Sequence, residues 1–235
     1  MKSRRPPLDL TLAEGIALIR PAPKPDIARL RAAAPRGDGH AVLVLPALAR
    51  GDPYTVRFRG FLSSVGYAAY GWNLGINIGP TRRLLDGAAD RLLGLSSTHG
   101  PVSIVGFSLG GLFGRWLALR SPERVRQVIS VCSPIHEPAR NFWLPLQPVF
   151  SLWRGHDLRA LAEEVARPLP VPCTVLYSRS DGLVHWPACV DSACLEDCTE
   201  IAGPHVLIAG NAQVMGIVAE RLARSAVTMP GACSR

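Results

Sequence analysis

The chain has 235 residues, of which 48% are hydrophobic and 19% charged, and its formal net charge is +8 at pH 7. This composition excludes a disordered chain and a repeat array, and the length suits one domain with one core. The charge suggests a nucleic-acid ligand, but the basic residues are scattered and are not interleaved with aromatic ones, so we expect no nucleic-acid partner. No apolar run approaches the roughly 20 residues of a membrane-spanning helix, so we predict no transmembrane segment.

Residues 1–38 are predicted to form an N-terminal helical extension packed on the domain. The pattern over residues 12–19 predicts an amphipathic helix, and a second, short helix ends before the breaker at residues 35–40. The start of the chain lacks the roughly 7–15-residue apolar core and the small-residue cleavage site of a secretion signal. We therefore expect a cytoplasmic location.

From residue 39 onward, predicted strands alternate with predicted helices. That order is typical of an α/β fold with a mostly parallel central sheet and helices on both faces. The strands are expected at residues 40–47, 67–72, 102–107, 125–133 and 172–178, and the helices at residues 58–65, 80–95, 112–120 and 212–224. Residues 39–235 are expected to form the main domain, with a short cap insertion at about residues 134–170, where the alternation stops.

Residues 106–110 read Gly-Phe-Ser-Leu-Gly, and this G-x-S-x-G pattern stands between a predicted strand and a predicted helix. A serine at such a turn adopts strained backbone angles, and Gly106 and Gly110 remove side chains that would collide there. The Ser108 hydroxyl would then lie at the carboxyl end of the sheet, beside the unpaired N–H groups of the next helix. The pattern predicts a nucleophilic serine.

A serine hydroxyl needs a general base, and the base needs an acid that orients it. We expect His205 as the base, because it follows the last strand signal in a turn ahead of the final helix. We expect Asp181 as the acid, because it comes immediately after the strand predicted at residues 172–178. The sequence also offers alternatives. For the base these are His136, His156 and His185, and for the acid they are Asp157, Asp191 and Asp197.

Two backbone N–H groups are predicted to hold the oxyanion of the reaction. One belongs to Leu109, the residue after the serine. The other comes from the loop after the first core strand, where we choose Leu48 because Pro46 has no N–H to donate.

Five segments occur in this order along the chain: VLVLPALARGD, GWNLGINIGP, GFSLGG, YSRSDGLVHW and GPHVLIAGNAQV. Together they resemble the α/β-hydrolase superfamily, and most of all its small bacterial lipase and esterase-like members, over about residues 39–222. The resemblance implies Ser108 as nucleophile, Asp181 as acid and His205 as base.

The loop after the first strand departs from the family pattern. Many relatives carry His-Gly there, whereas this chain has Pro46 and Ala47. An alanine adopts positive φ less freely than glycine does. The departure therefore affects the geometry of the second oxyanion donor, which this loop supplies.

The expected insertion carries four aromatic residues among several prolines and would lie over the mouth of the site: Phe142, Trp143, Phe150 and Trp153. They predict either the packing of a cap on the domain or an apolar wall for an acyl chain. Both interpretations exclude a strongly charged substrate as the first choice.

We therefore predict a serine hydrolase that cleaves carboxylic esters, with an apolar acyl group, through an acyl-enzyme. The partner is a small ester or lipid-like substrate, and neither a metal nor an organic cofactor is expected. The alternatives are an acyltransferase on the same triad, a catalytically silent α/β-hydrolase scaffold that binds a ligand or partner, and a basic protein in peripheral contact with a membrane.

The cysteines Cys189, Cys194 and Cys198 lie close together in the sequence but contain no CxxC pair. We interpret them as buried or loop thiols in preference to a zinc site.

Overall fold

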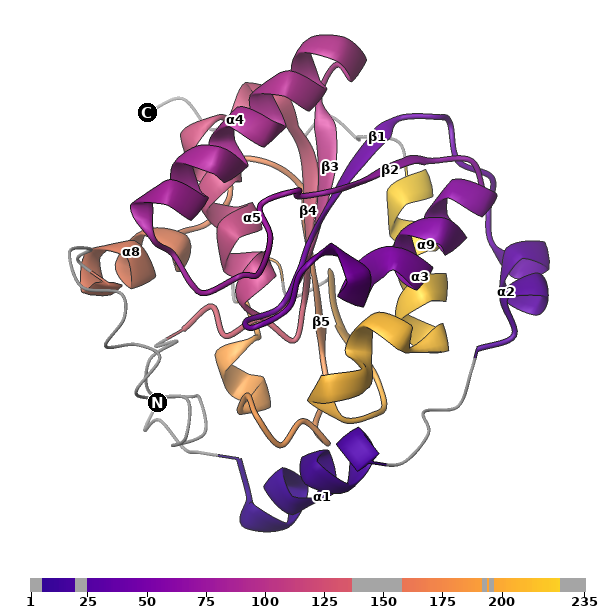
Figure 1. The fold of residues 1–235 in the computed structure, drawn as a ribbon, viewed down its shortest axis with the longest axis vertical. Helices are drawn as coiled ribbons and strands as arrows, with labels where there is room; N and C mark the ends of the chain where they lie inside the picture. Colours follow the sequence, from indigo (N-terminus) through magenta and orange to yellow (C-terminus); the bar gives the residue numbers. More distant parts are fainter. Residues whose placement is uncertain (1–5, 20–24, 137–157, 192–193, 195–196, 225–235) are drawn as a thin grey trace.

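The structure, a computed structural model, describes residues 6–19, 25–136, 158–191, 194 and 197–224. Its centre is a six-stranded sheet with the order β2-β1-β3-β4-β5-β6, in which every neighbouring pair is parallel (Figure 1). The strands are β1 (Ala41–Leu45), β2 (Ala68–Gly71), β3 (Val102–Phe107), β4 (Val125–Val131), β5 (Cys173–Tyr177) and β6 (Cys198–Glu200). The α/β fold class predicted from the sequence is confirmed.

Helices surround the sheet, and short 3-10 helices stand in the connecting segments. The α-helices are α1 (Leu8–Ile19), α2 (Ile27–Ala33), α3 (Asp52–Ser64), α4 (Arg82–His99), α5 (Leu109–Arg120), α8 (Leu158–Val165) and α9 (Ala212–Ala223). The 3-10 helices are η1 (Pro122–Arg124), η3 (Trp186–Ala188) and η5 (His205–Gly210).

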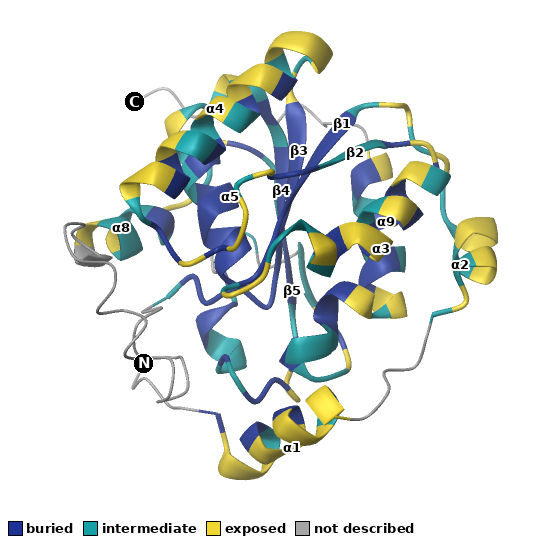
Figure 2. Ribbon diagram, in the orientation of Figure 1, coloured by how far each residue is buried: buried dark blue, intermediate teal, exposed yellow. Residues whose placement is uncertain are grey.

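The central strands are buried on both faces because their side chains alternate between two apolar cores. In β1, Val42 and Val44 join the core on one face, whereas Leu43 and Leu45 join the core on the other. Helices α2, α3 and α9 cover the first face, and α4, α5 and α8 cover the second (Figure 1). The sheet is therefore dark blue throughout its centre, and exposed residues lie on the outer sides of the helices and in the connecting loops (Figure 2).

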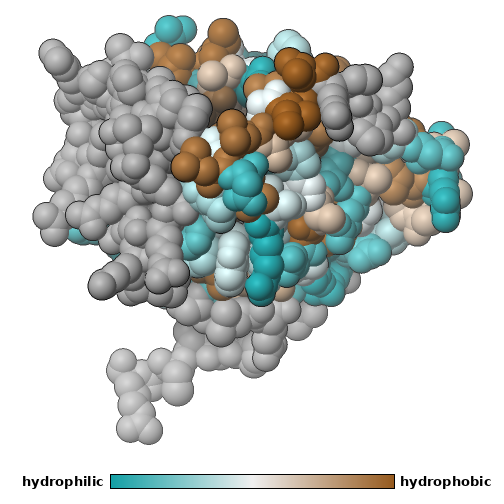
Figure 3. All heavy atoms as spheres, turned by 90° about the horizontal axis from the view of Figure 1, so that it is seen from below, coloured by the Kyte–Doolittle hydropathy of each residue, from teal (hydrophilic) through white to brown (hydrophobic). Residues whose placement is uncertain are grey.

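Helix α1 belongs to neither layer and lies across one end of the molecule (Figures 1 and 2). Its outward side chains are large and apolar: Leu8, Leu12, Ile16, Leu18 and Ile19. Its buried residues are polar, namely Thr11 and Glu14. Seen from below, this end of the molecule presents brown apolar side chains next to teal polar ones (Figure 3).

Several element boundaries differ from the predicted ones, each for a local reason. The helix predicted at residues 58–65 begins at Asp52, since Pro53 fits the first helical turn. The helix predicted at residues 112–120 begins at Leu109, directly after Ser108, because tertiary packing outweighs the low helix propensity of two glycines. The helix expected at residues 12–19 begins at Leu8.

Two described elements were not predicted. Strand β6 has three residues, none of them buried, and it carries no apolar strand pattern. Helix α8 falls inside the predicted cap insertion, where prolines and aromatic residues mask the helical pattern. The division at residue 38 and the extent of the cap stay predictions.

The prediction of free thiols was wrong for Cys194, which forms a disulfide with Cys173 at the start of β5. Cys189 and Cys198 are free thiols, and Cys189 is buried. Pairing was missed because the partner is 21 positions away and belongs to a different segment. Among the described residues, no helix is long and apolar enough to cross a membrane.

Candidate active site

Three predicted site residues follow three strands of the sheet. Ser108 comes immediately after β3, Asp181 follows the end of β5 at Tyr177, and His205 follows the end of β6 at Glu200. Strand β4 separates β3 from β5, and β6 adjoins β5. Because the strands are parallel, all three residues lie at the carboxyl edge of the sheet, where open α/β sheets bind ligands.

Ser108 stands in a strained turn between β3 and α5. Its φ is 51° and its ψ is −120°, which is unusual for a residue with a side chain. A Cβ on Gly106 would lie 2.4 Å from the backbone of Gly111, and a Cβ on Gly110 would lie 2.4 Å from the Leu45 carbonyl oxygen. The two glycines of the motif are therefore required by close backbone approaches on either side of the serine.

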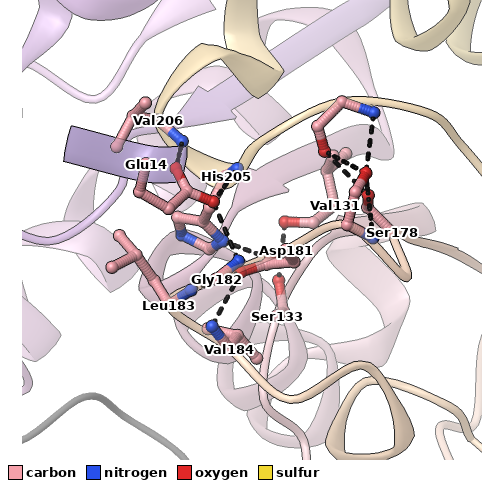
Figure 4. Close-up of polar contacts among 12 residues, drawn as sticks. Glu14, Val131, Ser133, Ser178, Asp181, Gly182, Leu183, Val184, His205 and Val206 are labelled. Carbon is pink, nitrogen blue, oxygen red and sulfur yellow. Dashed lines mark hydrogen bonds and ion pairs between the residues drawn. The ribbon is translucent and has the colours of Figure 1, made fainter. Parts of the chain in front are cut away.

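Asp181 and His205 form a buried hydrogen-bonded pair (Figure 4). The Nδ1 atom of His205 lies 2.5 Å from Oδ2 of Asp181. The other carboxylate oxygen, Oδ1, accepts the backbone N–H groups of Leu183 at 2.9 Å and Val184 at 2.7 Å. A carboxylate only accepts, so Nδ1 carries the proton and Nε2 of the neutral ring is left as an acceptor.

Two carboxylates face His205 and control its pKa. Burial disfavours the imidazolium and lowers the pKa of His205. The charge and hydrogen bond of Asp181, together with the charge of Glu14, outweigh burial, so this pKa lies above its ordinary value of 6.5. The imidazole is therefore a stronger base than a histidine in water.

Strand β4 lies between the serine and the acid–histidine pair. The Ser108 N–H donates to the Val131 carbonyl at 2.8 Å, and the next residue, Cys132, donates its own N–H to Leu176 on β5 at 2.7 Å. The thiol of Cys132 lies within 4.8 Å of the nearest ligand atoms of Asp181 and His205. The Ser108 hydroxyl itself makes no hydrogen bond within the described part of the chain.

Cys132 adds a third chemical group to this edge of the sheet. Cys132, Asp181 and His205 together offer a donor set that a metal ion could use. Burial, and secondarily the charge of Asp181, raises the pKa of the Cys132 thiol well above its ordinary value, so the thiol stays protonated. A protonated thiol is a poor metal ligand and a poor nucleophile.

A buried asparagine, Asn77, holds the loop after β1, and this loop passes close to the start of α5. The Nδ2 atom of Asn77 donates to the Pro46 carbonyl at 2.8 Å. The backbone carbonyl of Asn77 accepts the N–H of Ala49 at 2.7 Å. The N–H of Leu48 has no partner among the described residues, and the N–H of Leu109 stands at the start of α5, where helical N–H groups lack intrahelical acceptors. The positive φ in this loop falls at Ala49, at 57°, and not at Ala47.

A hollow of about 430 Å³ opens beside the same loop. Its lining includes Ala49, Pro53, Tyr54 and Ile76, with Arg50 and Asp52 also contributing. The Tyr54 ring packs edge-on against Phe107, the residue before Ser108. One wall of the hollow therefore contacts the residue that precedes Ser108.

The predicted alternatives that the structure describes have other roles. Asp191 pairs with the buried guanidinium of Arg115 at 2.7 Å, and Asp197 pairs with Arg224 at 3.0 Å. The His136 ring lies 3.1 Å from the Val190 carbonyl, and His185 precedes η3. The remaining predicted residues lie outside the described residues: Phe142, Trp143, Phe150, Trp153, His156 and Asp157.

A second aspartate, histidine and serine set lies at the opposite, amino edge of the sheet. His40 contacts Asp38 through Nδ1 and lies 2.8 Å from the Ser103 hydroxyl through Nε2. Ser103 is part of β3, and its neighbouring backbone groups are paired with β1 and β4. None of the helices that the structure describes begins there, so within the described residues this set lacks the free helical N–H groups that could bind an oxyanion.

Sequence reasoning missed three residues at the carboxyl edge: Glu14, Asn77 and Cys132. Asn77 sits in a segment whose asparagines are typical of turns, so the pattern gave no sign of its burial. For Glu14 the sequence offers one signal, namely a charged residue within an amphipathic helical pattern. Only the fold reveals that the apolar side of that pattern faces outward.

Comparisons with known proteins agree with this fold. Residues 95–170 match the family described as alpha/beta hydrolase fold, a span that includes Ser108. No curated protein matches the sequence at a significant level.

Many solved structures share the fold. A lipase-esterase related protein from Clostridium acetobutylicum is 13% identical, with a TM-score of 0.54, over 80% of this chain and 96% of that one. The naproxen esterase of Bacillus subtilis is 16% identical, with a TM-score of 0.52, over 82% and 86% of the two chains. An extracellular alpha/beta-hydrolase from a Paenibacillus species is 12% identical, with a TM-score of 0.55, over 79% and 100%. At such identities the likeness establishes the fold.

Proposed function

Because residues 95–170 match the alpha/beta hydrolase fold family and many solved structures share the fold, we propose that this chain is a serine hydrolase of carboxylic esters within the α/β-hydrolase superfamily. In this proposal Ser108 is the nucleophile, His205 the general base and Asp181 the acid that orients the base. The observation that carries it is the buried Asp181–His205 hydrogen bond at the edge where Ser108 occupies a strained turn. The lipase and esterase names of the solved relatives support the same reaction class.

The reaction begins when Nε2 of His205 takes the proton of the Ser108 hydroxyl. The serine oxygen attacks the ester carbonyl, and the N–H groups of Leu48 and Leu109 bind the resulting oxyanion. His205 then gives its proton to the departing alcohol, which leaves an acyl-enzyme. Water, deprotonated by His205, attacks this acyl group. As the bond between the acyl carbon and the serine oxygen breaks, His205 returns the proton to that oxygen, which releases the carboxylic acid and restores the serine.

The substrate that we propose carries an apolar acyl group. The hollow beside the β1 loop supports this choice, because Ala49, Pro53 and Ile76 line it and the Tyr54 ring forms part of its wall. Its volume of about 430 Å³ falls within the range of small-molecule sites. An acyltransferase would use the same acyl-enzyme with a different acceptor, and a chain-length series of nitrophenyl esters with added alcohols tests both points.

A cytoplasmic location stays a prediction from the sequence. The Cys173–Cys194 disulfide argues against it, since disulfides persist mainly in oxidising compartments.

Labelling with a fluorophosphonate probe tests the nucleophile. We expect the native protein to label, Ser108→Ala not to label, and His205→Ala to label at least about 100-fold more slowly, because the serine loses its general base. Ser103→Ala is the matched control, since Ser103 also lies beside a histidine but at the other edge of the sheet. Labelling that persists in Ser108→Ala, or that disappears in folded Ser103→Ala, would refute the assignment. A folded native protein that never labels would favour a silent scaffold.

A further inference from the structure

Helix α1 is attached to the rest of the molecule through polar groups. Its large apolar side chains point outward, and Ile19 is 84% exposed, whereas Glu14 is 2% exposed. Burial of apolar surface, the usual reason for a helix to dock, therefore contributes little here. The hydrogen bonds of its buried side chains must hold α1 in place.

The backbone of α1 lies directly on the turn that follows Asp181. A Cβ on Gly182 would lie 2.2 Å from the Leu10 carbonyl oxygen, so only glycine fits there. The Thr11 hydroxyl donates to the Gly182 carbonyl at 2.9 Å. Helix α1 thus contacts the residue next to the proposed catalytic acid.

The Glu14 carboxylate joins the acid turn to the histidine segment (Figure 4). Its Oε1 accepts the N–H of Gly182 at 2.9 Å and the N–H of His205 at 2.6 Å. Its Oε2 accepts the N–H of Val206 at 3.0 Å. All three partners are donors, which suits an ionised carboxylate because it only accepts.

These contacts give η5 a cap from a distant part of the chain. The residue at its N-cap is Pro204, which supplies no side-chain hydrogen bond. The first N–H groups of a helix have no acceptor within the helix, and a negative charge is favourable beside them. Glu14 supplies both the acceptors and the charge to His205 and Val206.

We propose that Glu14 is a positioning residue, which aligns Asp181 and His205 by holding the backbones of both through one buried carboxylate. The inference rests on the proposed hydrolase function. Glu14 does not reach the reacting atoms, so it acts on the rate through the geometry and the charge around His205. Through Glu14, helix α1 then supports the alignment of the site and is not only a cover of the domain.

The charge of Glu14 also affects the pKa of His205. Three ionisable groups face His205: Asp181 from the turn after β5, Glu14 from α1, and the Cys132 thiol from the end of β4. Glu14 is one of the causes that raise the pKa of His205. Its neutralisation should therefore lower this pKa.

The test compares Glu14→Gln with Asp9→Asn in the full chain. Both changes turn an acid of α1 into its amide, but Asp9 is exposed in the first turn of the helix. For Glu14→Gln we expect kcat on a nitrophenyl ester to fall by about 10- to 100-fold with little change in KM, as small misalignments of catalytic groups do. The acid limb of its pH–rate profile should move to lower pH, because a neutral His205 persists further into acid. Asp9→Asn should match the native protein in both measurements.

A folded Glu14→Gln protein with native kcat and a native acid limb would overturn the proposal, as would equal changes in Asp9→Asn. If Glu14→Gln does not fold, Glu14→Asp takes its place: it keeps the charge but shortens the reach, so kcat should fall while the acid limb stays. An unchanged kcat in Glu14→Asp would then count against the positioning role.

A nuclear magnetic resonance titration of the His205 ring separates this inference from the proposed function, because it needs no turnover. The midpoint should be lower in Glu14→Gln than in the native protein, even if neither hydrolyses an ester. An unchanged midpoint would remove the electrostatic part of the proposal. Native protein without activity, but with a shifted midpoint in the variant, would sink the hydrolase assignment and leave the action of Glu14 on His205 standing.

Discussion

Asn77 is fully buried and holds the backbone of the loop after β1 by hydrogen bonds. Glu14 holds the backbone of the acid and histidine segments in the same way. The side chain and the backbone of Asn77 bind both sides of the loop after β1, at Pro46 and at Ala49. A second contact through Oδ1 to the N–H of Gly79 at 3.1 Å fixes the amide orientation. The proposed donor Leu48 lies between the two bound positions, so its N–H direction depends on Asn77.

We expect Asn77→Ala to weaken both folding and catalysis. The buried Pro46 carbonyl would lose its donor, which should lower the free energy of unfolding by about 1–3 kcal/mol. A loosened loop should reduce kcat/KM by about 10- to 100-fold, since oxyanion donors act only in an accurate geometry. Urea unfolding and ester hydrolysis measure the two effects.

Asn73→Gly is the control for this prediction. Asn73 is exposed and has a φ of 58°, which glycine adopts without strain. It should leave kcat/KM near the native value. Equal losses of activity in the two variants would mean that the whole segment, and not the Asn77 amide, supports the site.

The residues whose edge of the sheet could be inferred from the sequence are those that follow strongly patterned strands. Ser108 follows six consecutive buried residues, and Asp181 follows a strand with a buried centre, so their edge of the sheet could be inferred from strand direction alone. Glu14 and Asn77 could not be found in this way. Their partners lie far away in the sequence or in irregular backbone, and a hydrogen bond to a main-chain group leaves no residue pattern.

At the scale of elements, helices α1 and α9 pack on the rest of the molecule through two different kinds of interaction. Helix α9 buries Val214, Met215 and Val218 against the sheet, as its sequence pattern predicts. Helix α1 buries polar residues, so its apolar pattern predicts a helix but does not reveal which side of it faces the domain. Elements held by apolar burial could be predicted from the periodicity of apolar residues. Strand β6 depends on backbone pairing, and the docking of α1 depends on buried hydrogen bonds. Neither of these leaves a periodic pattern in the sequence.

The docking of α1 can be tested with two glycine substitutions of opposite expected sign. Gly182→Ala places a Cβ 2.2 Å from the Leu10 carbonyl oxygen, so α1 must move, and we expect a loss of about 1–3 kcal/mol in stability. Gly15→Ala lies on α1 with no atom within 4 Å of the new Cβ, and should gain about 0.5–1 kcal/mol from helix propensity. Thermal unfolding measures both.

Catalysis should respond to the first of these substitutions and not to the second. Displacement of α1 by Gly182→Ala removes Glu14 from the acid and histidine segments, so kcat should fall together with stability. Native activity in folded Gly182→Ala would show that the contact between α1 and the turn after Asp181 has no bearing on the rate.

Across the whole molecule, a half-buried histidine, His40, and a buried one, His205, stand at opposite edges of one sheet in opposite electrostatic settings. Burial lowers the pKa of His40, and the charge of Arg126 adds to this, although Asp38 opposes both. The pKa of His205 is raised, because Asp181 and Glu14 outweigh its burial. One sheet thus holds a histidine with a lowered pKa at its amino edge and a histidine with a raised pKa at its carboxyl edge.

These shifts set the dependence of folding stability on pH through the difference in proton uptake between the folded and unfolded chains. The contribution of His40 is present above its ordinary pKa of 6.5 and is lost as the pH falls through its lower folded pKa. The contribution of His205 is present below 6.5 and is lost as the pH rises through its higher folded pKa. The pKa of Asp38, lowered to about 2 because its hydrogen bonds to His40 outweigh burial, affects stability only in stronger acid.

We therefore expect the free energy of unfolding to decline on both sides of the ordinary histidine pKa, and each side to depend on a different residue. Urea unfolding between about pH 5 and pH 8 measures this, since histidine is the side chain that ordinarily titrates there. Replacement by glutamine removes the titrating group, so His40→Gln should flatten the acid side and His205→Gln the alkaline side. The reverse assignment, or an acid side that stays equally steep in His40→Gln, would show that the two edges of the sheet do not hold their histidines in the protonation states inferred from their surroundings.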